Sequence, residues 1–340
     1  QTPGIIESVF KGTIIFMPIL LTSYVVGGIC EVLFAVIRKH EINEGFLVTG
    51  MLIPLTLPPD IPLWMVGVAT VFGIVIGKEI FGGTGFNVFN PALVARAFLF
   101  FAYPAYMSGD KAWVVKPTSY YPQGDVDYIT QATPLGDLAN TAYDGTSPYV
   151  SELTGYTWSE MFLGFVPGSI GETSTLCVLI GALFLIMNGI GSWRTMIGCV
   201  LGMLFMTLTL NHIVGPLFVQ ENAFLFVTPH WHFVIGSFAF ATVFMATDPV
   251  SSAHTDRGRY YYGFLIGFMG VLIRVLNPAY PEGMMLAVLF ANGFAPLIDY
   301  YVVKANILRR QNRTSRSFSP SSVNSVEKKE EVIADPVEVN

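Results

Sequence analysis

Three carboxylates lie where charge is expensive, within or directly after long apolar runs. Glu31 falls two-thirds of the way along the first apolar segment, Asp248 follows one in FMATDPVSSAHTD, and Asp299 interrupts APLIDYYVV. A charged side chain inside a membrane span usually serves an ion pathway or a ligand, because its burial in hydrocarbon is costly. We therefore predict such a role for Glu31 and Asp299, whereas Asp248 could equally be the N-cap of a helix beginning at Pro249.

Two other polar features in apolar surroundings have structural explanations. Arg96, in NPALVARAFLFF, could pair with a carboxylate or cap a helix as well as bind a ligand. His230 and His232 are two residues apart, so on a helix they would point about 200° away from each other and could not share a metal. Interfacial anchoring by His and Trp is the favoured interpretation of that run.

The remaining candidate is a hydroxyl in the most polar part of the chain. The stretch DVDYITQATPLGD (residues 125–137) lies in a polar segment that runs from Ser108 to Ser159 between apolar segments. Thr133 precedes Pro134, and the residue before a proline is disfavoured in the helical conformation. From residue types alone this stretch is most simply an ordinary polar turn.

Composition indicates what kind of elements must position these residues. Of the 340 residues, 52% are hydrophobic and only 12% are charged, against about 25% charged in soluble domains. The chain is therefore predicted to be an all-α polytopic membrane protein. It has no Walker motif, no recognisable nucleophile–base pair and no CxxC spacing among its three cysteines. These features favour a membrane transport or redox subunit over a soluble enzyme.

Nine apolar segments are predicted to cross or enter the membrane, and several are too short for about 30 Å of hydrocarbon at 1.5 Å per residue. Short segments broken by Gly or Pro often mark the binding site of a transporter-like fold, where the backbone is buried in protein or lines a cavity. The predicted segments are Thr13–Ile37, Gly45–Leu57, Leu63–Ile80, Val88–Met107, Thr173–Met187, Trp193–Leu210, Ala223–Ala246, Tyr260–Leu276 and Gly283–Val303.

The basic residues predict the orientation of these segments. If the segments alternate, Lys11, Lys111 and Lys116 fall on one side and nearly all other Lys and Arg residues on the opposite side, which is then cytoplasmic. The polar segment and the N-terminus are then on the outer side. A chain that begins outside without a signal peptide is expected to have lost an upstream span, which would make ten in the intact protein.

Two membrane halves are expected. GVATVFGIVIGK resembles GFLIGFMGVLIR, and LVARAF aligns with LFANGF at the same offset, which favours a two-fold internal repeat. The tail is rich in Ser and Asn and then of mixed charge, which is typical of disorder. The predicted units are a first membrane half (1–107), an outer loop (108–159), a second membrane half (160–310) and a disordered cytoplasmic tail (311–340).

From Thr2 to about Arg310 the chain resembles the NqrB family, the membrane subunits of the sodium-translocating NADH:quinone reductase, and, more distantly, the RnfD subunits of the Rnf electron-transport complex. The motifs that carry the resemblance are EVLFAV, HEINEGFLVTG, KEIFGGTG, NPALVARAFLFFAYP, PGSIGETSTL, FMATDPVSSA and LIRVLNPAYPEGMMLAVLFANGFAPLID. HEINEGF and FVPGSIGETSTL favour the sodium-pump branch. The resemblance implies a protein of the bacterial inner membrane with ten spans, a cytoplasmic C-terminus and a periplasmic loop at residues 108–159.

The resemblance gives the polar stretch a role. The family carries FMN joined through its phosphate to a threonine hydroxyl, attached on the outer side by a flavin transferase at a motif resembling Asp-Gly-x-Ser/Thr-Gly-Ala-Thr. Here DYITQAT keeps the Asp, both hydroxyl residues and the Ala, but has Tyr128 and Gln131 where glycine is usual. Thr133 is therefore the expected attachment residue for covalent FMN.

Further roles are implied by matching positions. The family holds a second, non-covalent flavin, riboflavin, in its membrane part, and Asn87 and Asn90 match residues near it. Asparagine amides can donate to and accept from the edge of an isoalloxazine ring. The alternative for these asparagines is to cap the segment that begins at Pro91.

Quinone and sodium are assigned in the same way. Gly27, Gly28 and Glu31 match positions linked with quinone and its inhibitors, and the glycines would let a flat ring lie against the helix backbone. Glu31, Asp248 and Asp299 match acids linked with sodium uptake or passage. The sequence shows no complete coordination shell for the ion and no resident metal site.

The resemblance thus implies a subunit of a six-subunit, redox-driven sodium pump. Electrons from NADH would enter through another subunit, pass through FMN and riboflavin to ubiquinone or menaquinone, and drive export of Na⁺. Two alternatives stay open. One is a urea- or ammonium-channel-like solute transporter without redox chemistry, since broken half-spans suit it equally well. The other is the RnfD counterpart of a ferredoxin-linked Rnf complex.

Overall fold

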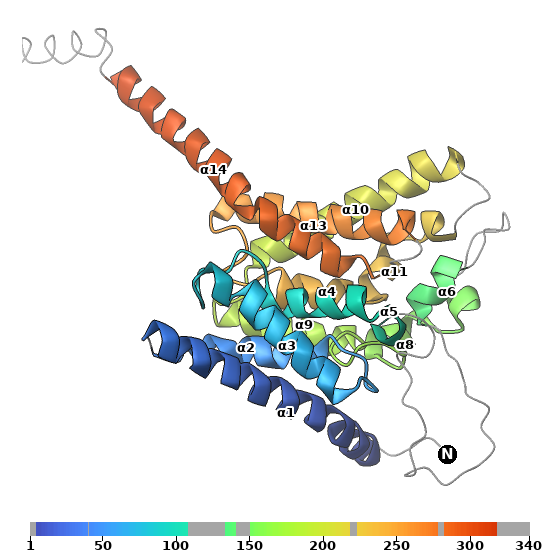
Figure 1. Cartoon of the computed structure of the whole chain (residues 1–340). Coiled ribbons are helices and arrows are strands. Elements are labelled where there is room, and N and C mark those ends of the chain that lie inside the picture. Colours follow the sequence, from blue (N-terminus) through green and yellow to red (C-terminus); the bar gives the residue numbers. More distant parts are fainter. Residues whose placement is uncertain are drawn as a thin grey trace, which may run out of the picture.

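The computed structural model describes residues 5–39, 41–107, 133–140, 150–217, 223–277 and 282–317, and every regular element in these ranges is a helix (Figure 1). Five helices are long and apolar enough to cross a membrane, and three shorter apolar helices accompany them. The long helices are α1 (Ile5–Arg38), α3 (Leu63–Gly77), α10 (Trp193–Thr209), α13 (Asp256–Leu276) and α14 (Met284–Ser317); the short ones are α2 (Gly45–Leu55), α4 (Pro91–Ala102) and α9 (Thr175–Met187). Helices α3 and α10 reach spanning length together with the 3₁₀ turn Glu79–Phe81 and the π-helical turn Leu210–Val214 that continue them. The predicted all-α polytopic class is confirmed, and the counts of nine and ten spans stay predictions.

Polar caps fix where several helices begin. Asn90 accepts hydrogen bonds from the N–H groups of Ala92 and Leu93 at the start of α4, whose first residue is Pro91. Hydroxyl side chains accept from backbone N–H groups in the same way at the starts of α9, α10 and α13; these are Ser174, Ser192 and Thr255. Each cap satisfies backbone donors that a helix start leaves without intrahelical partners.

The long helices keep apolar side chains on their outward faces. On α1, the side chains of Val25, Ile29 and Val36 are each more than half exposed. A helix that is apolar on its outward face as well as its inward face is typical of a membrane span. These faces are the ones expected to meet lipid.

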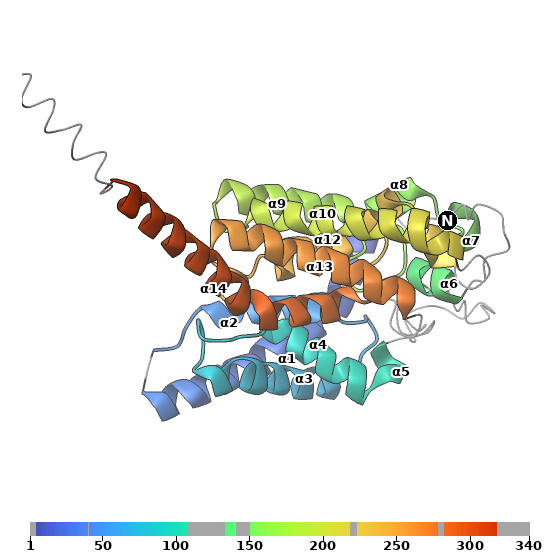
Figure 2. The same cartoon turned by 90° about the horizontal axis from the view of Figure 1, so that it is seen from above.

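The helices form two groups with a shared boundary. Figure 2 shows α1, α2 and α3 on one side and α9, α10 and α13 on the other. Along the boundary α14 packs against both α4 and α13. The boundaries of the four predicted units stay predictions.

The closest packing in the structure joins α10 and α13. Gly198 and Gly202 of α10 lie against Gly263 and Gly267 of α13, and a Cβ on any of the four would overlap backbone atoms of the other helix. Small residues at such positions let two helix backbones approach closely in a membrane. This pair gives the second group of helices a rigid centre.

One predicted segment is not a single helix. In place of a continuous span at 223–246, the chain forms a 3₁₀ turn (Ala223–Phe226), α11 (Pro229–Val234), α12 (Phe238–Phe240) and a π-helical turn (Ala241–Met245). The breaks have local causes, since Thr228 before Pro229 is extended and Gly236 has a φ of +65°. The prediction of short, broken segments is confirmed here, and the prediction of one span is wrong.

The last helix is longer than expected. Residues 311–317, assigned from composition to a disordered tail, continue α14 to Ser317. Polar composition argues against core packing but not against a helix. Residues beyond 317 lie outside the described part of the chain.

Candidate functional site

Thr133, the expected attachment residue, stands at the start of α6 (Pro134–Asn140). Its Oγ1 accepts a hydrogen bond from the N–H of Gly136 at 3.1 Å, and its carbonyl oxygen accepts from the N–H of Asp137 at 3.0 Å. Thr133 is therefore the N-cap of a short helix with proline in the first position. The side chain is half-buried, so its hydroxyl is held in a fixed place without being enclosed.

A small cavity adjoins Thr133. Its volume is about 20 Å³, which is room for about one water molecule. Four segments far apart in sequence form its wall: α6 with Leu135, the segment before α9 with Gly168, Glu172 and Thr173, the turn after α11 with Gly236, and the segment before α14 with Glu282. The fold thus brings two carboxylates to the threonine.

A buried arginine lies behind this wall. Arg274, in the last turn of α13, is 1% exposed, and its Nη1 donates to the carbonyl oxygen of His232 at 3.3 Å. Its Nε and Nη2 have no hydrogen-bond partner within the described residues. Nη2 lies 3.5 Å from the position of a Cβ on Gly236. The guanidinium therefore lies against Gly236, a residue that also lines the cavity of Thr133.

The two carboxylates of the cavity are also incompletely paired. Glu172 accepts from the N–H of Ser169 at 3.1 Å through Oε1, while its Oε2 and the Oε2 of Glu282 reach no donor in the described ranges. Burial raises the pKa of Glu282 to about 7; the charge of Glu172 adds to this shift, and Arg96 and Arg274 oppose it. Glu282 is therefore partly protonated at neutral pH.

His232 is buried rather than interfacial. Its ring stacks on Phe224 with centroids 6.2 Å apart, and its Nδ1 has no partner among the described residues. His230 is half-exposed and lies 3.1 Å from the hydroxyl of Thr228. The interpretation of this run as an interfacial anchor is therefore wrong for His232.

Glu31 lies in a buried charge network at the other end of the molecule. Its Oε2 is 2.5 Å from the Nζ of Lys78, which also donates to Thr84 at 3.0 Å and lies 3.7 Å from Glu79. Arg38 pairs with Glu79 at 2.8 Å. Glu31, whose burial in an apolar segment is energetically costly, is thus paired with Lys78.

The two glycines before Glu31 differ in their surroundings. A Cβ on Gly27 would lie 3.0 Å from Cδ1 of Ile74, so Gly27 serves the contact between α1 and α3. A Cβ on Gly28 would meet only the ring of Phe46, at 3.8 Å. Gly28 therefore leaves more room beside the backbone for a flat ring than Gly27 does.

The two asparagines of NVFNPAL, Asn87 and Asn90, also differ in what their side chains bind. Asn90 caps α4, so the capping alternative is confirmed for it, and its Nδ2 lies 3.8 Å from the sulfur of Met245. Asn87 is buried, and its Nδ2 donates to the carbonyl of Phe89 at 3.1 Å. Arg96 is buried in α4 and forms no ion pair within 4 Å in the described ranges, so the carboxylate alternative finds no partner among those residues.

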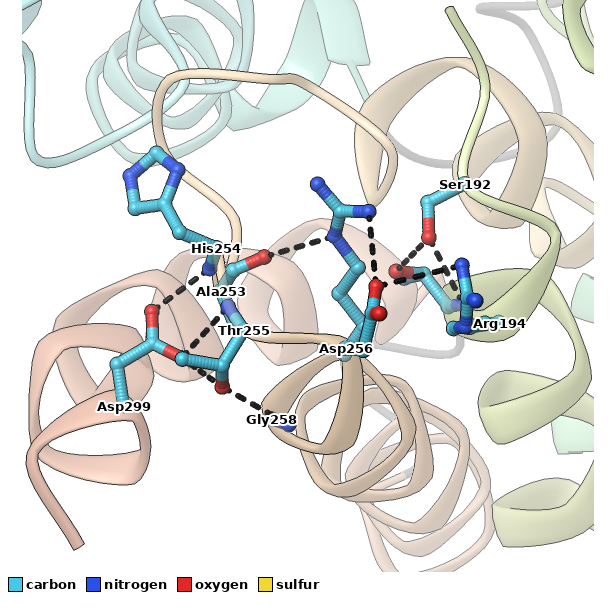
Figure 3. Close-up of polar contacts among 10 residues, drawn as sticks. Ser192, Arg194, Ala253, His254, Thr255, Asp256, Gly258 and Asp299 are labelled. Atoms are coloured by element: carbon cyan, nitrogen blue, oxygen red, sulfur yellow. Dashed lines mark hydrogen bonds and ion pairs between the residues drawn. The ribbon is translucent and has the colours of Figure 1, made fainter. Parts of the chain in front are cut away.

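Asp299 holds the start of α13 (Figure 3). Its carboxylate accepts from the N–H groups of His254, at 2.7 Å, and Thr255, at 3.0 Å, and from the hydroxyl of Thr255 at 2.5 Å. An anion at a helix N-terminus is stabilising. Asp299, for which the sequence offered no structural explanation, therefore has a structural role in addition to any role in ion passage.

Asp248 stabilises a turn. It accepts from the N–H of Val250 at 3.2 Å and from the hydroxyl of Ser251 at 2.6 Å, and no helix begins at Pro249, so the predicted helix N-cap is wrong. The run Asp-Pro forms an Asx-type turn instead. Within the described residues no hydrogen bond joins any two of the three acids, and no cluster of His, Cys, Asp or Glu could hold a metal ion.

Comparison with known proteins decides the family. A model of the NQR2, RnfD, RnfE family matches residues 2–308. The chain belongs to this family. The B-type subunit of the Na(+)-translocating NADH-quinone reductase of Klebsiella pneumoniae (strain 342) is 51% identical over 312 residues, covering 91% of this chain and 72% of that protein. The same subunit of Neisseria meningitidis serogroup B is 50% identical (92% and 72% covered), and that of Chromohalobacter salexigens is 51% identical over 321 residues (94% and 73%). The resemblance drawn from the motifs is confirmed.

The charged group beside Thr133 in this NQR2-family chain escaped sequence reasoning. Arg274 interrupts the apolar run GVLIRVLNP as Arg96 interrupts its own run, so the cost of a charge in a span was a usable signal. Glu172 and Glu282 lie in short connections between helices. A carboxylate is common in such connections, so the sequence offers no reason to single these two out. Only the folded chain shows that they meet.

Proposed function

We propose that this chain is a membrane subunit of a Na⁺-translocating NADH:quinone reductase. The observation that carries the proposal is 51% identity, over 91% of the chain, to a subunit of an enzyme of that name, on a fold whose described part is all helical. Binding of NADH is assigned to another subunit of the six-subunit complex, because the described ranges contain no strand on which a dinucleotide fold could be built. The relatives named above favour neither the channel-like alternative nor the Rnf alternative.

Covalent FMN is placed on Thr133. The supporting observations are a half-buried hydroxyl outside the long helices and, beside its cavity, a buried guanidinium with unused N–H donors. Phosphate oxygens are strong acceptors for such donors. The flavin supplies electron acceptance and release, and a flavin transferase is the partner that attaches it.

Riboflavin is placed at the start of α4, with Asn87 as its better candidate. Asn90 uses its amide oxygen to cap the helix and has only Nδ2 to offer. Asn87 uses Nδ2 to bind Phe89, and no described donor reaches its amide oxygen. An amide oxygen can accept from a ring N–H of the flavin.

Quinone is placed beside Gly28 and Phe46, where the backbone of α1 is less crowded than at Gly27, with Gly27 and Glu31 close by in the same helix. Sodium passage is assigned to Glu31, Asp248 and Asp299. At Glu31 a sodium ion must compete with the ammonium group of Lys78. At Asp299 it must compete with three hydrogen-bond donors.

The chain is placed in a bacterial inner membrane, with residues 108–159 periplasmic and the C-terminus cytoplasmic. In the structure, α6 and the end of α13 lie at one end of the long helices, and the free end of α14 lies at the other (Figure 1). The arginine-rich end of α14 suits the cytoplasmic face.

Substitution at Thr133 tests the flavin assignment. In the complex made with an active flavin transferase, Thr133→Ala is expected to abolish flavin fluorescence on the denatured subunit and to stop quinone reduction, because no hydroxyl remains to carry the phosphate. Thr133→Ser keeps a hydroxyl and serves as the control. Flavin fluorescence retained by Thr133→Ala, or a flavin peptide that lacks residue 133, would reject the site.

A further inference from the structure

A buried guanidinium with unused donors is an expensive feature. Arg274 is 1% exposed, yet its Nε and Nη2 have no acceptor among the described residues. Leaving a buried donor without a partner costs more than a hydrogen bond gains, and the cost is larger for a charged group. Such a group in a folded protein calls for an acceptor that the described residues do not supply.

We propose that Arg274 anchors the phosphodiester through which the flavin is joined to Thr133. The inference rests on the proposed flavin attachment at Thr133 and adds the residue that receives its phosphate. Nε and Nη2 lie on one edge of the guanidinium, and that edge can donate two parallel hydrogen bonds to two phosphate oxygens. A phosphodiester carries one negative charge, which matches one arginine.

The surroundings of Arg274 leave this edge unpaired among the described residues and next to a residue of the cavity wall. Nη1 is held by the carbonyl oxygen of His232, which leaves the Nε–Nη2 edge unpaired. Between this edge and the cavity stands Gly236, whose Cβ position lies 3.5 Å from Nη2 and 3.3 Å from Leu135. Gly236 has a φ of +65°, where glycine is favoured. Because Gly236 has no side chain, no Cβ fills the space beside Nη2 at this residue of the cavity wall.

The size of the cavity sets what enters it. A volume of about 20 Å³ admits a group the size of one water molecule, such as a phosphate oxygen. The isoalloxazine ring therefore lies outside the cavity. The anchor fixes the phosphate end of the flavin, and other surfaces must hold its ring.

The carboxylates of the cavity do not prevent an anion from binding. The pKa of Glu282, raised to about 7 by burial, leaves it partly protonated and able to donate at neutral pH. Glu172 keeps one oxygen on the N–H of Ser169. With Arg96 and Arg274 both buried nearby, the group carries net positive charge whenever Glu282 is protonated.

The first test measures attachment of the flavin. The full complex is made with active flavin transferase, and the initial rate at which flavin fluorescence appears on this subunit in a denaturing gel is compared between variants. Arg274→Gln should lower that rate about tenfold or more, as expected for the loss of a bidentate charge-assisted contact. Arg274→Lys should give a rate between those of the wild type and Arg274→Gln, because lysine keeps the positive charge but lacks the two parallel N–H donors of the guanidinium. Lys304→Gln, which removes an exposed cation on α14, should keep the wild-type rate.

The Lys variant protects the test against a folding failure. If Arg274→Gln does not assemble, Arg274→Lys keeps the buried positive charge and decides the matter through its rate. A wild-type rate in Arg274→Gln, or in Arg274→Lys where that variant alone assembles, overturns the anchor.

The second test does not depend on the flavin. The complex is made without the transferase, and hydrogen–deuterium exchange of the peptide containing Gly236 is measured in inorganic phosphate and in chloride of equal ionic strength. Phosphate should slow exchange in the wild type and in Thr133→Ala, but not in Arg274→Gln. No phosphate effect in the wild type, or an equal effect in Arg274→Gln, overturns the anchor. Covalent flavin retained in Thr133→Ala would instead overturn the proposed attachment site, so the two failures are distinguishable.

Discussion

At the scale of single residues, the buried charges of this chain follow two different solutions. Glu31 is neutralised by Lys78 at 2.5 Å, and that pair extends to Glu79 and Arg38. Arg274 is not neutralised by any ion pair within 4 Å in the part of the chain that the structure describes. A paired charge serves the fold, whereas an unpaired one has bonding capacity left for a ligand.

Substitutions at Glu31 and at Lys78 are expected to change the sodium dependence of the enzyme in opposite directions. Glu31→Gln and Lys78→Gln each leave one buried charge short of its partner, so each should cost about 3 kcal/mol of stability and lower the thermal midpoint of the complex in detergent. Their effects on sodium should differ. Lys78→Gln frees the carboxylate and should lower the apparent KM for Na⁺ in quinone reduction, whereas Glu31→Gln should raise it.

The sodium titration decides between a structural and an ion-path role for Glu31. Equal loss of stability in both variants with unchanged sodium dependence would leave the pair purely structural. Gly12→Ala, whose added Cβ meets no atom within 4 Å, is the control for a change in the same helix that leaves the pair intact.

At the scale of elements, the contact between α10 and α13 is set by the absence of side chains. Gly198, Gly202, Gly263 and Gly267 bring the two backbones together, and α13 carries Arg274 in its last turn. Any displacement of α13 along this seam would move the guanidinium relative to Thr133. The packing of two helices therefore positions a group at their outer end.

Gly202→Ala is expected to destabilise the chain. Its Cβ would overlap the carbonyl oxygen of Phe264, and forcing extra atoms into a packed contact costs about 1–3 kcal/mol. Gly12→Ala places the same methyl group in a helix with no atom within 4 Å and should leave the thermal midpoint unchanged or slightly raised. Equal midpoints for the two variants would contradict the close approach of α10 and α13.

At the scale of the whole molecule, the two similar stretches of the sequence lie in helices that run in opposite directions. In Figure 1, α3 runs toward the end of the molecule where α14 is free, and α13 runs away from it. Opposite directions are what an inverted repeat in a transporter-like fold requires. Lys78 and Arg274, which match in the two stretches, therefore lie at opposite ends of the molecule.

The proposed orientation can be tested by labelling. Cys177 is exposed, while Cys30 and Cys199 are buried, so Cys177→Ser provides the background. Ser159→Cys, in α8 (Trp158–Leu163), should react with a membrane-impermeant maleimide in intact cells. Asn306→Cys, in the exposed part of α14, should react only after permeabilisation. The reverse pattern would contradict a periplasmic loop and a cytoplasmic C-terminus.

The sequence by itself determined the helical class, most helix boundaries and the family, because hydropathy, caps and motifs are local properties. Eight of the predicted segments contain or overlap the long and short apolar helices, and the segment at 223–246 failed because its breaks depend on the φ of Gly236. Only the tertiary structure decided the partners of the charges. Lys78 meets Glu31 across 47 positions, and Glu172 and Glu282 line one cavity with Thr133, because contact between distant segments is set by packing rather than by neighbouring residues.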